Sequence, residues 1–231
     1  MTIVDNLSRP EERELLRERG DRLRLLLAER NLGYGAAANL ALRKSDAELV
    51  CVSNADLVPR PTALARLAEA ALDDPAAGMV GPVYEEGTQH YHAQLPTPAI
   101  LLARAMVGSF GRRLPSAPAA GQRAVVGQVS GACFVMRREL WERAGGFDER
   151  FFLWYDDVDL AKRLVDLGHR NLVVGSAVVE HAGAGSFAQI EPATAQTIRL
   201  DSLERYIKTH HRRWMPAARP LLRLSRAVRA R

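Results

Sequence analysis

The sequence predicts an α/β domain, because apolar segments that suit buried strands alternate with segments of helical periodicity. Residues 48–53 and 79–83 are two such apolar segments, and residues 61–72 between them carry leucines along one helical stripe. The chain has 231 residues, of which 47% are hydrophobic and 26% charged, as in one globular domain with a substantial core. We therefore expect a mostly parallel central sheet flanked by helices.

The remaining elements follow from local pattern. Ser8, with Glu11 three residues later, matches a capping box and predicts a helix to about Arg19. The glycine and alanine run from Gly33 opens a second helix. Further strands are predicted at residues 2–4, 23–27, 133–136, 169–174 and 178–181, and further helices at 100–107, around 141, from about 158, and at 194–208.

Composition excludes several classes of protein. No apolar run approaches the roughly 20 residues that span a bilayer, and the chain does not open on a signal peptide. Cys51 and Cys133 both lie in strand-like runs, so we expect buried hydrophobic side chains rather than a disulfide or a metal pair. These features favour a cytoplasmic protein.

The positive charge is concentrated at the end of the chain. The formal net charge is +5, yet nine Lys and Arg residues and no acids follow from Arg205 onward, which leaves −4 for the rest. We call residues 212–231 the basic segment; its leucines alternate with regularly spaced arginines. It suits an anionic membrane surface, including the inner face of the plasma membrane, or equally a solvated helix or disordered end. Nucleic acid is not an expected partner, since no recognition module accompanies the charge.

The most informative stretch runs from Ser130 to Asp159. A turn at Ser130 and Gly131 leads into an apolar run, a helix-like segment and a Gly-Gly break, and an aromatic run then ends in Asp156, Asp157 and Asp159. Apolar surroundings raise the cost of carboxylate charge, so acids behind aromatics need a reason. One reason is local, because Asp is favoured where a helix begins. The other is a chemical role.

Polar residues also gather around the first glycine-rich turn. Asp5 ends the first predicted strand, and Asn31 and Asn39 bracket a turn that contains Gly33 and Gly35. Two glycines before a helix allow a ligand to approach the backbone closely. A glycine turn that binds nothing is the commoner case.

Two further positions suit a divalent cation. Asn54 and Asp56 follow a buried strand, and oxygen ligands two residues apart suit Mg²⁺ or Mn²⁺ on a diphosphate. An Asx turn without metal is the alternative. His181 ends another predicted strand, where a lone histidine is usually structural. Residues 85–123 have little regular pattern, which is typical of mobile or functional loops, and we expect His90 and His92 there to be solvated.

The 130–159 stretch closely resembles the acceptor-side block of family-2 inverting glycosyltransferases, which have a GT-A fold. That block reads "sGA…lRR…GGFDE.FF.y.ED.DL", and the resemblance extends over nearly all of residues 2–187. It implies that Asp157 is the catalytic base, with Asp156 in place of the usual Glu. It also implies that Gly131, Trp154 and Tyr155 lie on the acceptor side.

The resemblance also assigns the donor side. A "VDN.S" segment like the one containing Asp5 contacts the nucleotide base in that family. The family's "N.G.g.A.N" motif corresponds to Asn31, Gly33, Gly35 and Asn39, which are then expected to hold the loop and the donor. Asn54 and Asp56 correspond to the metal-binding "D-x-D", and His181 to a histidine that completes the metal site.

The resemblance implies a rhamnosyltransferase-like enzyme that transfers a sugar to a glycan or lipid-linked acceptor of the bacterial cell envelope. The donor would be a dTDP- or UDP-sugar, and the cofactor would be Mg²⁺ or Mn²⁺. Residues 1–211 would be one domain, with a nucleotide-sugar part (1–83), an acceptor and catalytic part (84–190) and a C-terminal helix (191–211), followed by the basic segment. The family's first strand and helix would precede residue 1, so we expect an N-terminally truncated fold. The alternative is a non-catalytic nucleotide-sugar-binding or partner-docking remnant, although intact Asp56, Asp157 and His181 count against it.

Overall fold

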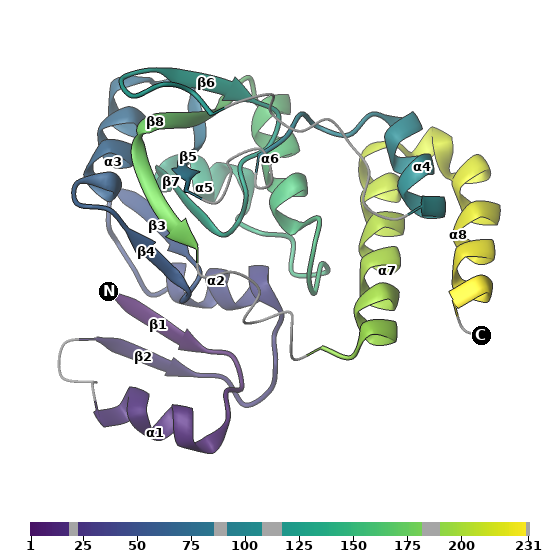
Figure 1. The fold of residues 1–231 in the computed structure, drawn as a ribbon, viewed down its shortest axis with the longest axis horizontal. Helices are drawn as coiled ribbons and strands as arrows, with labels where there is room; N and C mark the ends of the chain where they lie inside the picture. Colours follow the sequence, from purple (N-terminus) through teal and green to yellow (C-terminus); the bar gives the residue numbers. More distant parts are fainter. Residues whose placement is uncertain (19–22, 86–91, 108–116, 182–189, 230–231) are drawn as a thin grey trace.

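The structure is a computed structural model, and it describes residues 1–18, 23–85, 92–107, 117–181 and 190–229 (Figure 1). The chain starts with a small β-α-β unit, in which strand β1 (Thr2–Asp5) pairs in parallel with β2 (Arg24–Leu27) and helix α1 (Pro10–Glu18) lies between them in sequence. Helix α1 begins on Pro10, and Glu12 rather than Glu11 accepts the Arg9 N–H. In the described part of the chain, β1 pairs only with β2. The additional strand that the resemblance places before β1 stays a prediction.

The central sheet has six strands. Its order is β3-β7-β5-β8-β4, and β6 pairs with the same strand β8. The strands are β3 (Leu49–Ser53), β4 (Leu57–Pro59), β5 (Ala77–Tyr84), β6 (Arg123–Val126), β7 (Cys133–Arg137) and β8 (Arg170–His181). The long β8 is a single strand where the sequence pattern predicted two, and its two ends pair with β6 and β4 respectively.

The α/β class is confirmed, but the sheet is mixed rather than mostly parallel. Only β5 and β8 run parallel within it, whereas the β3–β7, β5–β7, β4–β8 and β6–β8 pairs are antiparallel. The hydrophobicity of a single strand does not show whether it pairs in parallel or antiparallel, because a strand buried on both faces is apolar in either case. Strands β4, of three residues, and β6, of four, were also absent from the prediction.

Helices cover the sheet and add a second layer beside it (Figure 1). Those against the sheet are α2 (Tyr34–Leu42), α3 (Ala63–Asp73), α5 (Arg138–Ala144) and α6 (Asp156–Asp166). Three others, α4 (Pro98–Val107), α7 (Pro192–His210) and α8 (Met215–Arg229), pack on one another to one side, with a short 3₁₀ turn, η3 (Arg212–Trp214), before α8. Phe151, Tyr155 and Val158 join that helical group to the start of α6.

The basic segment is part of the fold. Most of it forms η3 and α8, and Met215, Ala218 and Leu222 are buried against α4 and α7. A fully solvated helix or a disordered end is therefore wrong for residues 212–229. The sequence could not reveal this, because a helix with one buried and one exposed side has the same pattern on a membrane and on a protein.

Two single-residue predictions are corrected. Cys51 is exposed on the edge strand β3, while Cys133 is buried as expected. His92 is buried rather than solvated: its Nδ1 accepts the Ser130 N–H at 3.1 Å, so Nε2 donates to Pro82 O at 2.8 Å. Burial lowers the pKa of His92 to about 4, and the ring is neutral at pH 7. His90 lies outside the described residues.

Candidate active site

The backbone is strained immediately before the acid pair. Trp154 and Tyr155 have φ of 61° and 65°, and Tyr155 is the residue that caps α6. Two consecutive bulky residues in the left-handed region cost roughly 1–3 kcal/mol each, and such strain gathers at functional sites. The turn places Asp156 and Asp157 as the first two residues of α6.

The Asp157 carboxylate is held by two backbone donors. Gly131 N–H donates to Oδ2 at 2.9 Å, and Val158 N–H donates to Oδ1 at 2.8 Å. Burial raises the pKa of Asp157, while these two N–H groups and the more distant Arg104 charge oppose that rise. The side chain is only partly buried, so a reactant can reach it. Asp157 is thus an accessible carboxylate in a fixed orientation.

Asp156 has the opposite environment. It is 4% exposed, and its Oδ2 is a buried oxygen without a hydrogen-bond partner in the described part of the chain. That oxygen faces α2, since a Cβ built on Gly35 would lie 3.6 Å from it. Burial, followed by the Asp157 charge, raises the pKa of Asp156 to about 7. Of the two acids, Asp156 therefore holds a proton more readily, whereas the two backbone donors favour the charged form of Asp157.

The first turn of α2 packs against this pair. The Tyr34 hydroxyl donates to Gly131 O, and the Tyr34 N–H donates to Phe152 O at 3.0 Å. A Cβ on Gly131 would meet the Tyr34 ring at 3.1 Å and the Asp157 Cβ at 3.3 Å, so the glycine makes room for both. The sequence pattern gave no sign of this role for Tyr34, because its partners lie about 100 residues away.

The glycine-rich turn lies directly against the backbone of Phe152. Gly33 has φ 83° and ψ 176°, a conformation that is essentially limited to glycine. A Cβ there would lie 2.3 Å from Phe152 O. Asn31 Oδ1 accepts from Gly33 N–H at 2.9 Å and from Asn6 Nδ2 at 3.1 Å. Asn6, which the sequence analysis did not single out, thereby joins the end of β1 to this turn.

Gly35 and Asn39, further along the same motif, both contact Phe147. A Cβ on Gly35 would meet Phe147 Cβ at 2.8 Å. Asn39 is buried, its Nδ2 donates to Phe147 O at 2.9 Å, and its Oδ1 accepts the Phe147 N–H at 3.0 Å. The glycine-rich motif thus holds the Gly-Gly-Phe-Asp-Glu segment, residues 145–149, through the Asn39 side chain and the close packing at Gly35. The donor-contact roles of Asn31, Gly33, Gly35 and Asn39 stay predictions.

Asp5 is occupied within the β-α-β unit. Its side chain is buried, accepts the Ser8 N–H at 2.9 Å and forms an ion pair with Arg13. Arg13 also donates to Ala28 O at 2.5 Å. Burial works to raise the pKa of Asp5, but the Ser8 hydrogen bonds and Arg13 outweigh it, so the pKa lies below the ordinary value. Asp5 anchors α1 to the two strands, and contact with a nucleotide base stays a prediction.

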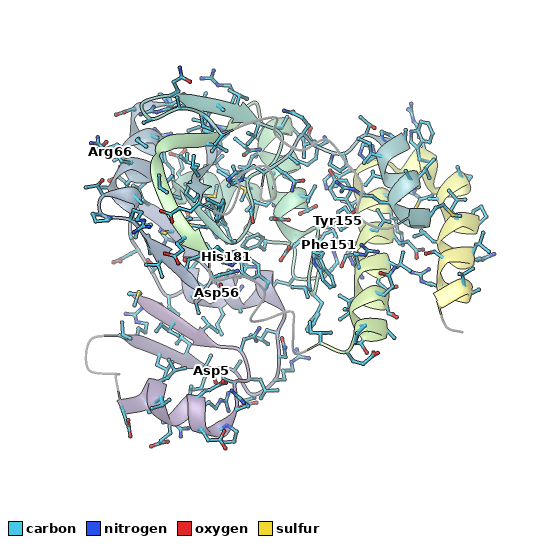
Figure 2. All side chains as sticks on the ribbon, in the orientation of Figure 1. Asp5, Asp56, Arg66, Phe151, Tyr155 and His181 are labelled. Carbon is cyan, nitrogen blue, oxygen red and sulfur yellow. The ribbon has the colours of Figure 1, made fainter. Side chains whose placement is uncertain are left out.

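The predicted metal residues lie together. His181 Nε2 is 3.1 Å from Asp56 Oδ1, because β4 pairs with the end of β8 and places Leu57 opposite His181 (Figure 2). Asn54 lies just before them, where its N–H donates to Ala132 O at 2.8 Å. No cluster of three or more His, Cys, Asp or Glu side chains suited to a metal occurs among the described residues. Two converging donor atoms fit a cation whose other ligands are phosphate oxygens and water.

The acceptor-side aromatics face the helical group. Tyr155 is buried, its ring centroid is 5.4 Å from that of Tyr206 on α7, and Arg104 on α4 donates to its hydroxyl at 3.3 Å. Trp154 is partly buried and packs on the same cluster. Figure 2 places Tyr155 beside α7, apart from Asp56 and His181. Arg104 thus contacts the residue that immediately precedes the two acids of α6.

The site thus has two parts, the acid pair at the start of α6 and the Asp56–His181 pair at the ends of β4 and β8. Residues 1–144 match the family described as "Glycosyl transferase family 2". The chain is 32% identical to a Mycobacterium tuberculosis protein named N-acetylglucosaminyl-diphospho-decaprenol L-rhamnosyltransferase, over 99% of this chain and 81% of that protein. The chain therefore belongs to glycosyltransferase family 2 and resembles rhamnosyltransferases within it.

Solved structures agree on the fold. The crystal structure of GalNAc-T7 with UDP, GalNAc and Mn²⁺ has a TM-score of 0.71 and 14% identity, covering 95% of this chain and 44% of that one. The mannosyltransferase PcManGT from Pyrobaculum calidifontis, in complex with GDP-Man and Mn²⁺, has a TM-score of 0.58 and 20% identity, covering 99% and 63%. This chain spans less than two thirds of either protein. Both comparisons confirm the GT-A fold.

Proposed function

We propose that this protein is an inverting glycosyltransferase that moves rhamnose from a dTDP- or UDP-sugar to a lipid-linked or glycan acceptor in cell-envelope polysaccharide synthesis. The family supports glycosyl transfer, and the relative's name supports the sugar and the acceptor class. The observation that carries the mechanism is the environment of Asp157, a carboxylate fixed by the Gly131 and Val158 N–H groups beside Asp156, whose pKa burial raises to about 7.

In the proposed step, Asp157 takes the proton of an acceptor hydroxyl as that oxygen attacks the anomeric carbon of the donor. The bond between that carbon and the diphosphate oxygen breaks, and the nucleoside diphosphate leaves with the electron pair. Asp156 cannot replace Asp157, because its buried oxygen faces Gly35 and Phe147. One base with no carboxylate nucleophile implies a single displacement, which inverts the anomeric centre.

A transfer assay tests the proposal. The protein is incubated with dTDP-rhamnose or UDP-rhamnose and a short-chain N-acetylglucosaminyl-diphospho-lipid, and the product's anomeric configuration is determined by NMR. We expect a single product of inverted configuration. A retained configuration, or no transfer with either donor, would contradict the proposal.

We also propose that Asp56 and His181 hold Mg²⁺ or Mn²⁺ on the donor diphosphate. A bound cation would offset the charge of the departing diphosphate. The convergence of the Asp56 and His181 donor atoms supports this assignment.

Binding of a nucleoside diphosphate should therefore require the cation. We expect Asp56→Asn to weaken calorimetric binding of UDP or dTDP at least about tenfold, and EDTA to have a similar effect on the parent protein. Asp46→Asn changes an exposed aspartate for which the structure records no side-chain contact, and it should have no effect. Equal binding with and without EDTA would assign Asp56 to a turn only.

We further propose that α8 lies on an anionic membrane surface. No helix in the described ranges is long and apolar enough to cross a membrane. The side of α8 opposite its buried residues nevertheless exposes Leu224 by 50% and Val228 by 64%, and Trp214 just before α8 is 45% exposed. Arg219 and Arg223 are exposed along the same helix. Exposed apolar groups flanked by arginines suit the interface of an anionic bilayer.

Vesicle binding tests this surface. We expect Leu224→Asn combined with Val228→Asn to lower sedimentation with vesicles containing phosphatidylglycerol severalfold, and high salt to weaken the parent's binding. Leu72→Asn on α3 is a matched control, because Leu72 is 45% exposed. If the parent ignores these vesicles at low salt, α8 serves another partner.

A further inference from the structure

His92 is a buried histidine whose two ring nitrogens both have backbone partners. It is 1% exposed, its Nδ1 accepts the Ser130 N–H at 3.1 Å, and its Nε2 donates to Pro82 O at 2.8 Å. Gly81 on β5 leaves room for the ring, since a Cβ there would lie 3.1 Å from His92 Cε1. Burial of a polar ring is unfavourable unless its nitrogens are paired. One of the two partners belongs to the turn that precedes β7.

The residue after Ser130 carries the donor that holds the proposed base. Gly131 N–H donates to Asp157 Oδ2 at 2.9 Å. The Ser130 and Gly131 N–H groups belong to consecutive peptide units, of which the first is held by His92 and the second holds Asp157. Because each peptide unit is planar, only the φ and ψ of Ser130 separate the two N–H groups. The direction of the first N–H therefore constrains the direction of the second.

The segment that follows His92 supports the same turn. Ala93 N–H donates to Gln128 O at 3.4 Å, and Ala93 O accepts the Gln128 N–H at 2.9 Å. A Cβ on Gly127 would lie 2.1 Å from Leu95 N, so the two segments are in direct backbone contact. His92 thus stands at the end of a short ladder that leads to the turn.

We propose that His92 is a positioning residue, which holds the Ser130–Gly131 turn so that Gly131 N–H stays on the Asp157 carboxylate. The consequence for catalysis rests on the proposed function, in which Asp157 is the base. If the Ser130 N–H loses its acceptor, the turn can rotate and carry the Gly131 donor away from Asp157 Oδ2. Asp157 then loses its orientation and one of the N–H groups that stabilise its charged form, so its pKa rises.

The other interpretation is that His92 only fills space and ties its segment to β5 through Pro82 O. Two substitutions separate the interpretations, because each keeps one of the two hydrogen bonds. In His92→Asn, Oδ1 takes the place of Nδ1 along the side chain and can accept the Ser130 N–H. In His92→Gln, the side-chain amide nitrogen takes the place of the ring Nε2 and can donate to Pro82 O, which leaves the Ser130 N–H without its acceptor.

The first measurement is the ionisation of Asp157, followed by the carbon-13 NMR shift of its carboxyl group across a pH titration. Absence of the signal in Asp157→Asn assigns it. We expect the midpoint of this titration to lie about one pH unit higher in His92→Gln than in the parent, and to be unchanged in His92→Asn. These variants retain the other charged or titratable groups that act on Asp157, which include Asp156, Arg104, Tyr34 and Tyr155.

His169→Gln is the matched control. His169 is a partly buried histidine beyond the last residue of α6, and its Nδ1 has no hydrogen-bond partner in the described part of the chain. The same substitution there should leave the Asp157 titration unchanged.

The second measurement is kinetic. In the transfer assay, His92→Gln should lower kcat/KM at pH 7 roughly tenfold to hundredfold, because a small misplacement of a catalytic group costs on that order. The acid limb of the pH profile of kcat/KM should also move to higher pH, since more of the base is then protonated. His92→Asn should stay close to the parent in both respects.

An unchanged Asp157 midpoint in His92→Gln, or an equal rise in both His92 variants, would overturn the inference and leave His92 with a packing role. If His92→Gln does not fold, His92→Asn decides: an unchanged midpoint supports the inference, and a raised one contradicts it. If the parent transfers no sugar while the midpoint rises only in His92→Gln, the proposed function fails but His92 still holds the turn on Asp157.

Discussion

Replacing Asp157 by Asn is expected to lower kcat by roughly 10²–10⁴-fold, the usual effect of removing a general base. The amide has nearly the shape of the carboxylate but cannot accept the acceptor's proton. Both carboxylate oxygens accept a backbone N–H, from Gly131 and Val158, so the amide also loses one of these hydrogen bonds. That loss costs about 1 kcal/mol of folding stability, which is small beside the catalytic effect.

Three measurements separate catalysis from structure. The melting temperature of Asp157→Asn should fall by only a few degrees, and calorimetric affinity for UDP or dTDP should stay within a few-fold of the parent. Asp156→Asn should reduce kcat less, because Asp156, with a pKa raised to about 7, is already partly protonated at pH 7 and its buried oxygen faces Gly35. Near-normal turnover in Asp157→Asn would remove it as the base, and a larger loss in Asp156→Asn would reverse the two assignments.

Gly33→Ala is expected to have the largest effect on stability. Gly33 combines φ 83° with ψ 176°, and the new Cβ would lie 2.3 Å from Phe152 O, a backbone atom that cannot move aside as a side chain end can. Conformational strain costs roughly 1–3 kcal/mol, and the collision adds about 1–3 kcal/mol more. A chain of this size loses about 2–4 °C of melting temperature per kcal/mol. Thermal unfolding should therefore shift down by roughly 4–24 °C.

Gly121→Ala is the matched control for this variant. Gly121 also has φ 83°, but a Cβ there meets nothing within 4 Å. It should show the cost of a positive φ without a collision, so a larger loss of stability in Gly33→Ala is expected from its ψ of 176° and its contact with Phe152. Because that contact holds the glycine-rich turn on the catalytic segment, Gly33→Ala should also lower kcat at temperatures where the protein remains folded. Equal effects of the two substitutions would mean that the chain near Phe152 adjusts freely.

Much of the secondary structure could be predicted because the hydrophobic pattern is local. The helices at α3 and α4 and the strands β2, β3, β5 and β7 lie where periodicity placed them within a few residues. The prediction failed where the deciding partner is distant in sequence. His92 shows this, because Pro82 O and Ser130 N–H satisfy both ring nitrogens and only thereby allow a histidine to be buried.

Residue types and motif spacing by themselves determined the family and the pairing of two acids with a preceding aromatic run. Through the resemblance, the sequence also predicted a cation at Asp56 and His181; the structure brings their donor atoms within 3.1 Å, and cation binding stays a prediction. Only the tertiary structure gave a physical reason for the difference between Asp156 and Asp157, since the pKa of each depends on burial and on donors such as Gly131, 26 residues earlier in the chain. The tertiary structure likewise placed Arg104 on the Tyr155 ring, 51 residues later in the chain, because which helices pack together is not encoded in sequence separation.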